Sequence, residues 1–159
     1  MDGIRAAILQ DHQAIHEIFC QIHALHAQAR PDIYRASADP LPFSQWQEML
    51  SSADDFLWVF EKDQEIAGVC WAQLRDIPAA PLTCARRLLR IEALGVGEPY
   101  RHQKIATQLW QTALEQARLL QVQSVELQVW NFNRPAMEFY QRLGMVPRAE
   151  LMEFPLSLQ

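Results

Sequence analysis

The stretch from Leu88 to Trp130 decides the fold, and it reads LLRIEALGVGEPYRHQKIATQLWQTALEQARLLQVQSVELQVW. Its first part, Leu88–Val96, is an apolar run that ends near two glycines and a proline, which is typical of a strand followed by a turn. From Ser124 to Trp130 apolar and polar side chains alternate, which is the two-residue period of a strand. Between these strands, apolar side chains recur at helical spacing, at Ile105, Leu109, Ala113, Ala117 and Leu120. A strand, a long helix and a second strand in this order predict a parallel crossover unit.

Upstream of this unit the patterns predict two helices and three strands. One helix runs from Asp11, which is placed to cap it, to about Gln28, and a shorter helix covers Phe43–Ser51. The link between these helices is rich in proline and predicts a loop that is a plausible place for substrate contacts. The predicted strands are Ile4–Leu9, Phe56–Phe60 and Ile66–Ile77, the last two joined into a hairpin by the polar turn 62–65.

Downstream of the unit, a further helix is predicted over Arg134–Leu143, and Gly144 is placed to end it as the C′ residue. The segment Val146–Leu156 then predicts a strand that closes the sheet. The chain has 159 residues and half of them are hydrophobic, which predicts a single domain over residues 1–159.

Charge and cysteine usage exclude several partners. Fourteen Lys and Arg against 19 Asp and Glu give a formal charge of −5, which argues against a nucleic-acid partner. No segment approaches the roughly 20 apolar residues that a membrane span needs, so no membrane partner is expected. The three cysteines lack the paired spacing of a redox or zinc motif, which favours a reduced, cytoplasmic protein.

Glycine is scarce, with only five in the chain, and this excludes the glycine-rich Walker A and Rossmann loops. The segment Tyr100–Ala106 nevertheless opens the long helix. The first turn of a helix offers unpaired backbone N–H groups and the positive end of the helix dipole, which together bind a pyrophosphate. By itself the segment fits an ordinary strand-to-helix loop with a solvated basic pair better than a phosphate site.

Two blocks of sequence, in this order and at this separation, fit the pattern of one family. They are Arg101-x-x-Lys104-x-Ala106, which matches the first and last positions of [QR]-x-x-G-x-[GA], and Asn133-x-x-Ala136-x-x-Phe139-Tyr140-x-x-x-Gly144-Met145. On the predicted framework of strand, loop, helix, strand and helix, they resemble the GNAT superfamily of acyl-CoA-dependent N-acyltransferases.

The resemblance implies a mixed α/β (α+β) fold. Its central sheet is mostly antiparallel, splayed between the fourth and fifth strands, and flanked by helices. It also implies acetyl-CoA as the acyl donor and direct acetyl transfer to a primary amine of a small molecule or peptide, and it allows a homodimer. The cofactor-binding residues that it implies are Leu94, Gly95 and Val96 on the fourth strand, Arg101, His102, Gln103, Lys104, Ile105 and Ala106 in the loop, and Asn133. Leu94 and Val96 are equally well explained as core residues, and Asn133 as a helix N-cap.

The resemblance further implies that the Tyr140 hydroxyl protonates or stabilises the departing thiolate, although an aromatic residue at helical spacing also fits simple packing. The amine must lose a proton before or during attack. Many family members carry a glutamate where this chain has Gln128, and an amide cannot act as a base. Glu92 and then Glu126 are therefore the candidate bases, unless each is only a solvated or ion-paired carboxylate.

Lys104 stands where the family pattern has glycine. We expect a lysine there only if its φ is negative and its side chain points away from the diphosphate, with hydration or a phosphate contact as its role. Lys104 and Gln128 keep a second function open, that of a non-catalytic module that senses acyl-CoA or binds a partner.

Four histidines occupy one arc of the first predicted helix: His12, His16, His23 and His26. Spacings of three and four residues can chelate a metal. No carboxylate or thiolate on the same face completes a site, so the pattern favours a structural or boundary role, and no metal is predicted.

Overall fold

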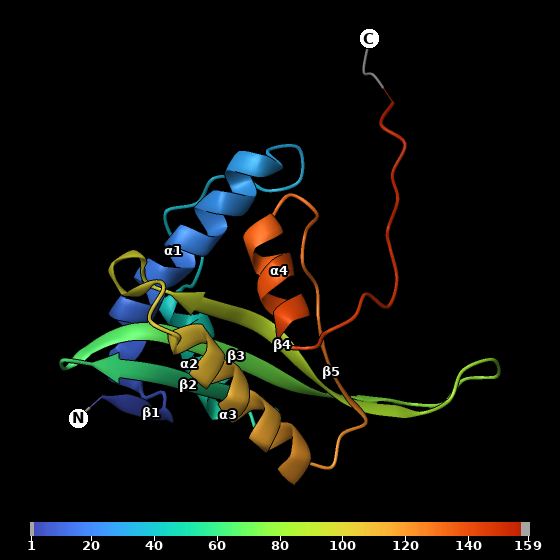
Figure 1. Ribbon diagram of the computed structural model, residues 1–159, viewed down its shortest axis with the longest axis horizontal. Helices are drawn as coiled ribbons and strands as arrows, with labels where there is room; N and C mark the ends of the chain where they lie inside the picture. Colours follow the sequence, from blue (N-terminus) through green and yellow to red (C-terminus); the bar gives the residue numbers. More distant parts are fainter. Residues whose placement is uncertain (1, 157–159) are drawn as a thin grey trace. The chain divides into compact units, whose positions relative to one another are not determined.

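The sheet that frames the fold has five strands in the order β1-β2-β3-β4-β5 (Figure 1). The computed structural model describes residues 2–156, and these divide into two compact units after Gln128. Neighbouring strands are antiparallel except for β4 and β5, which are parallel. The strands are β1 (Gly3–Ala6), β2 (Asp55–Lys62), β3 (Glu65–Ile77), β4 (Arg86–Val96) and β5 (Ser124–Leu127). The predicted mixed α/β fold with a mostly antiparallel sheet is confirmed.

Helices cover both faces of this sheet in the first unit (Figure 1). Two close approaches fix which helix lies on which face, because a Cβ added at Gly95 would meet Ile18 and Ile22, whereas one at Gly68 would meet Ile105 and Leu109. Gly68 pairs with Val96 and Gly95 with Val69, so the two glycines face opposite sides. The helices of this unit are α1 (His12–Ala29), α2 (Phe43–Ser51) and α3 (Ile105–Leu119), with short 3₁₀ turns at Leu9–Asp11 and Glu98–Tyr100.

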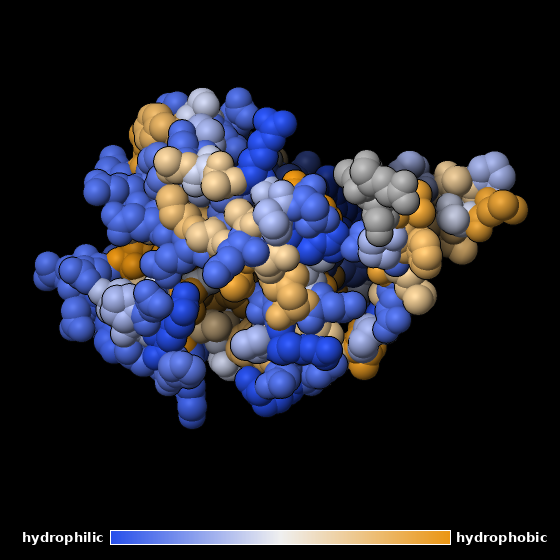
Figure 2. All heavy atoms as spheres, turned by 90° about the horizontal axis from the view of Figure 1, so that it is seen from above, coloured by the Kyte–Doolittle hydropathy of each residue, from blue (hydrophilic) through white to orange (hydrophobic). Residues whose placement is uncertain are grey.

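The main core lies between the sheet and the layer of α1 and α2. Trp46 of α2 is fully buried, and its indole N–H donates to the Leu9 carbonyl at 3.2 Å. On the other face, α3 buries Ile105, Leu109, Ala113 and Ala117 of the predicted stripe, whereas Leu120 follows the helix and is half-buried. The main core, on the side of α1 and α2, consists of Ile15, Ile18, Leu41, Trp46, Met49, Leu57, Val59 and Val69. Hydrophilic residues, blue in Figure 2, cover much of the visible surface.

The β2–β3 hairpin forms as predicted, and Lys62 pairs with Glu65 across a two-residue turn. Asp63 and Gln64 have φ of 50° and 67°. Positive φ at both central residues is the type I′ geometry that matches the twist of a hairpin.

Asp11 occupies the predicted N-cap position of α1, but its side chain makes no capping hydrogen bond to that helix, which corrects the prediction. Its carboxylate accepts from both terminal nitrogens of Arg5, at 2.7 and 2.9 Å, and from the Ile8 N–H at 2.8 Å. Burial alone would raise the pKa of Asp11, but the Arg5 guanidinium and the Ile8 N–H outweigh it and lower the pKa. Asp11 therefore ties the end of β1 to the start of α1.

This ion pair predicts acid sensitivity. Because the pKa of Asp11 is lower in the folded state, its stabilisation is present above about pH 4 and is lost as pH falls further. The substitution Asp11→Asn is expected to lower the free energy of unfolding at neutral pH by about 1–3 kcal/mol. Urea denaturation of both proteins at pH 7 and pH 3 checks this, and a cost that does not shrink at pH 3 would contradict the assignment.

Two strand predictions in the second half of the chain are wrong: one strand is shorter than predicted and the other does not form. The strand predicted over Ser124–Trp130 ends at Leu127, because β5 pairs with β4 only up to Ile91. Just beyond this point the register of β4 with β3 shifts and leaves Glu92 between paired positions, and such a bulge bends a strand. The strand predicted over Val146–Leu156 does not form: residues 146–156 carry no strand, and Pro147 and Pro155 remove two N–H donors from the segment.

The second unit contains α4 (Arg134–Arg142). Gly144 follows it with a φ of 94°, which confirms the predicted left-handed C′ position. Beyond α4 the large apolar side chains are exposed, namely Val146, Leu151, Met152, Phe154 and Leu156. No helix between residues 2 and 156 is both long and apolar enough to cross a bilayer.

Candidate acyl-donor site

The last five residues of β4 leave one edge of the strand without β5. Pairing between the two strands stops at Ile91 and Leu127, whereas β4 continues to Val96. The Gly97 N–H donates to the Ala67 carbonyl at 2.9 Å. Since backbone groups alternate along an antiparallel ladder, the N–H groups of Leu94 and Val96 point to the opposite edge. The predicted splay between the fourth and fifth strands is therefore present, with backbone donors along it.

The loop between β4 and α3 brings further N–H groups to the same end of the strand. Arg101 is extended, with φ of −65° and ψ of 159°, and His102 and Lys104 are left-handed. Lys104 is the N-cap of α3, which has no side-chain cap. An uncapped helix start preceded by left-handed residues presents a concave set of N–H groups to an anion. Ile105 is buried against the sheet and anchors this helix start.

The prediction of a negative φ at Lys104 is wrong. Lys104 has φ of 61° and ψ of 14°, a left-handed conformation that glycine adopts far more readily than lysine. A non-glycine residue pays roughly 1–2 kcal/mol for the left-handed region. The surrounding structure at the start of α3 therefore imposes a conformation that the intrinsic φ preference of lysine disfavours.

This strain predicts that Lys104→Gly stabilises the protein. Relief of the left-handed penalty is expected to raise the free energy of unfolding by about 1 kcal/mol, which thermal or urea denaturation measures. Lys104→Ala is the matched control, because alanine keeps the Cβ and is expected to gain nothing. A loss of stability in Lys104→Gly would show that the lysine side chain stabilises the loop.

Side chains from distant parts of the first unit surround the loop. The Arg101 guanidinium donates to the Val96 carbonyl and to Gln21 Oε1, each at 3.4 Å. Gln21 Oε1, on α1, also accepts the Glu98 N–H at 3.2 Å. No local pattern points to Gln21, because its contact with Arg101 spans 80 residues and no periodicity encodes it.

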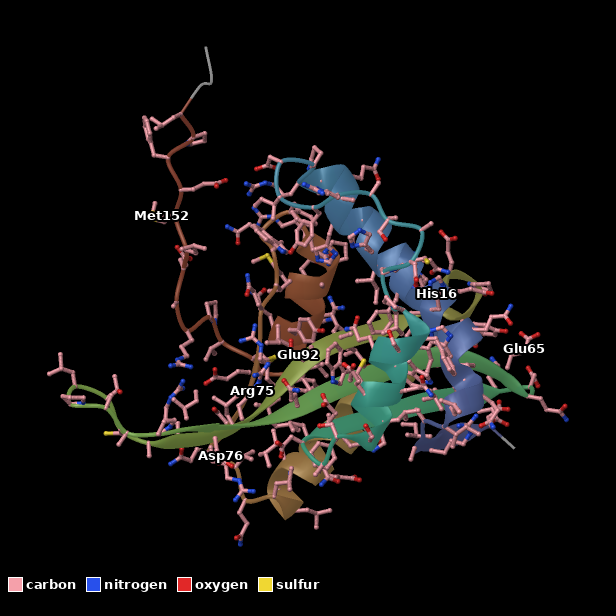
Figure 3. All side chains as sticks on the ribbon, turned by 180° about the vertical axis from the view of Figure 1, so that it is seen from behind. His16, Glu65, Arg75, Asp76, Glu92 and Met152 are labelled. Carbon is pink, nitrogen blue, oxygen red and sulfur yellow. The ribbon has the colours of Figure 1, made fainter. Side chains whose placement is uncertain are left out.

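Both candidate bases are in ion pairs. Glu92 Oε1 lies 3.2 Å from nitrogens of Arg75 and Arg90, and Figure 3 shows the labelled Arg75 and Glu92 close together. Glu126 Oε1 lies 2.8 Å from Arg86 Nη1. The carboxylates therefore have guanidinium partners in the structure, as the alternative interpretation anticipates, and their role as bases stays a prediction.

The predicted residues of the second unit lie on α4 and at its start. The Asn133 side chain accepts the Ala136 N–H at 3.3 Å, so it caps the helix, and a cofactor contact stays a prediction. Tyr140 is half-buried, with its ring centroid 5.2 Å from that of Phe139 in an edge-to-face arrangement.

Comparison with known proteins identifies the family. Residues 14–145 match the acetyltransferase (GNAT) family, a span that covers most of the chain. The chain belongs to the GNAT acetyltransferase family. The mixed sheet, in which β4 and β5 are parallel and separate after Ile91 and Leu127, is thus the sheet of a GNAT acetyltransferase.

Individual relatives agree with this assignment. The probable N-acetyltransferase camello of Xenopus tropicalis is 32% identical over 95 residues, which are 60% of this chain and 40% of that protein. A mutant BH1408 protein from Bacillus halodurans has a TM-score of 0.94 at 29% identity, over 97% of this chain and 99% of that one. An aminoglycoside N-acetyltransferase in complex with CoA has a TM-score of 0.73 at 12% identity, over 98% and 100% of the two chains, which shows the shared fold alone.

The histidines of α1 hold the link to α2 in this GNAT chain. His12 Nε2 lies 2.9 Å from the Leu41 carbonyl, and His23 Nε2 lies 2.6 Å from that of Arg35. His16 Nε2 lies 3.0 Å from Asp39 Oδ1. Among residues 2–156 no three His, Cys, Asp or Glu side chains are grouped to bind a metal ion. The stripe thus fastens the loop that the sequence predicts between the two helices.

Proposed function

We propose that this protein is an acetyl-CoA-dependent N-acetyltransferase that transfers the acetyl group directly to a primary amine. The observation that carries the proposal is the free edge of β4 at Leu94–Val96, which ends in the left-handed loop at the uncapped start of α3. One end of this surface suits the amides of an extended chain, and the other suits an anion.

The residues present fit CoA in these two respects. The pantetheine arm carries amides that can pair with the outward backbone groups of Leu94 and Val96, as an added strand would. The diphosphate suits the N–H groups of residues 101–106, with Arg101, His102 and Lys104 supplying positive or polar side chains beside it. When bound, acetyl-CoA supplies an activated thioester. The outward N–H groups of β4 then offer preorganised donors to the carbonyl oxygen of the acetyl group.

Proton transfer is assigned to a small set of side chains. Tyr140 donates its hydroxyl proton, or a hydrogen bond, to the departing thiolate. Glu92 is the first candidate to remove the proton of the amine and Glu126 the second, directly or through water. Each would have to exchange part of its ion pair with arginine for that contact.

The acceptor is proposed to be the amine of a small molecule or a peptide. The names of camello and of the aminoglycoside enzyme, both N-acetyltransferases, support an amine as the acceptor class. A cytoplasmic location and a homodimer are part of the same proposal, as is the absence of nucleic-acid and membrane partners.

Two measurements on the purified protein test the function. Acetyl-CoA and CoA are expected to raise the melting temperature, because a ligand that binds only the folded state stabilises it. Thiol release from acetyl-CoA is then followed with a panel of small amines, amino acids, aminoglycosides and peptides. Absence of both effects would overturn the proposal.

The second candidate is a GNAT module that binds acyl-CoA without catalysis. Gln128 in place of a glutamate, together with the arginine-paired Glu92 and Glu126, favours it. This alternative predicts thermal stabilisation by acetyl-CoA but no thiol release with any amine. Turnover with one amine of the panel excludes it.

A further inference from the structure

The loop that precedes α3 holds two strained residues within three positions. His102 and Lys104 have φ of 63° and 61°, and both are exposed. Non-glycine residues keep this conformation only where their surroundings impose it. The lysine side chain makes no capping hydrogen bond at the helix start. The conformation must therefore be imposed by contacts on the residues beside these two.

Those contacts come from the tip of the β2–β3 hairpin. The Tyr100 hydroxyl donates to the Glu65 carboxylate, and the Lys62 ammonium donates to the Gln103 side-chain oxygen. Figure 3 shows Glu65 at the hairpin tip. The two bonds hold residues on either side of His102, and Gln103 also lies directly before Lys104. We call Lys62, Glu65, Tyr100 and Gln103 the hairpin latch.

The hairpin is a suitable support because its own geometry is fixed. Lys62 and Glu65 are cross-strand partners that flank the type I′ turn. They carry opposite charges and are adjacent, yet each side chain hydrogen-bonds to a residue of the loop before α3. The Glu65 hydrogen bond also raises the pKa of Tyr100, so the phenol stays protonated as a donor. A third tie, from Gln21 on α1 to the Glu98 N–H, holds the start of the loop.

We propose that the hairpin latch holds the loop before α3 in the conformation that glycine would otherwise provide, and that its members are positioning residues for the diphosphate of the acyl donor. The proposal rests on CoA binding at this loop. When only a fraction of molecules has a competent loop, the apparent dissociation constant rises by the inverse of that fraction. If only one molecule in ten has the competent loop conformation, the apparent Kd for CoA rises about tenfold.

The test removes the latch without changing charge, in the double variant Tyr100→Phe/Gln103→Leu. Its Kd for CoA, measured by calorimetry, is expected to rise about 5- to 10-fold, and KM for acetyl-CoA should rise with it while kcat stays within about twofold. Gln108→Leu, the same change at an exposed position one turn into α3, is the matched control and should leave Kd unchanged.

Rescue separates positioning from direct contact with CoA. In the His102→Gly/Lys104→Gly background the same double substitution is expected to change Kd by less than about twofold, because glycine needs no support to be left-handed at either position. An equal loss in both backgrounds would overturn the latch, since it would mean that Tyr100 or Gln103 touches the ligand or acts independently of the loop conformation.

A second readout does not depend on CoA. Backbone ¹⁵N relaxation of the ligand-free protein should show greater mobility of residues 101–104 in the double variant than in the parent protein. An unchanged loop in the double variant would overturn the latch. If the parent protein bound no CoA but the loop became mobile as expected, the proposed function would fail while the structural role of the latch stood.

Discussion

Replacing Tyr140 by phenylalanine is expected to lower kcat for acetyl transfer by about 10²–10³-fold while the Kd for CoA stays within about twofold. The substitution removes one oxygen atom and keeps the aromatic ring, which contacts Phe139. If the hydroxyl protonates the thiolate as it leaves, its loss acts in the transition state and not in the bound ground state. Steady-state kinetics and calorimetry on the same preparation check the two halves of this prediction.

Phe139→Leu is the matched control for this experiment. It disturbs the ring contact on α4 but keeps the Tyr140 hydroxyl, so turnover should fall by no more than a few fold. A Tyr140→Phe variant with full turnover would contradict the proposed proton donor and leave packing as the role of Tyr140. Equal losses in both variants would point to the helix and not to the hydroxyl.

The largest effect on stability is expected from Trp46→Ala, which should lower the free energy of unfolding by about 3–5 kcal/mol. Trp46 is fully buried in the main core, and its N–H donates to the Leu9 carbonyl. The substitution leaves a cavity between α2 and the sheet and removes the donor of a buried hydrogen bond. Urea denaturation measures the loss, which is a large part of the stability of an ordinary domain.

Two neighbouring variants make the interpretation specific. Phe43→Ala lies on the same helix but at an exposed position, so we expect a cost of less than about 1 kcal/mol. Trp46→Phe keeps much of the apolar volume but loses the hydrogen bond, so its cost should fall between the other two. A small effect of Trp46→Ala would mean that α2 contributes little to the folded state.

Local patterns predicted most of the first unit. The stripe of Ile105, Leu109, Ala113 and Ala117 is buried as the helical period requires, and α2 spans the predicted Phe43–Ser51. Predictions failed where an element needs a distant partner. Residues 146–156 carry apolar side chains like a strand, but strand structure requires hydrogen bonds to another segment. The bulge of β4 at Glu92 and the end of β5 at Leu127 likewise depend on the pairing of strands and not on their own residues.

The candidate site divides in the same way. The loop before α3, and Asn133 as the N-cap of α4, follow from short motifs whose residues are close in sequence. The contacts of the loop do not: Glu65 meets Tyr100 and Lys62 meets Gln103 across 35 and 41 residues. No local signal predicts such pairs, because the fold alone determines which distant residues become neighbours.

By itself, the sequence determined the family, the crossover unit and the position of the loop, since these depend on the spacing of residues within one or two elements. Only the tertiary structure decided that Lys104 is left-handed. The intrinsic preference of lysine disfavours this conformation by roughly 1–2 kcal/mol. The identity of one residue therefore predicts a negative φ. The buried start of α3 and the hydrogen bonds from the β2–β3 hairpin act on the loop together, and their combined stabilisation exceeds this penalty.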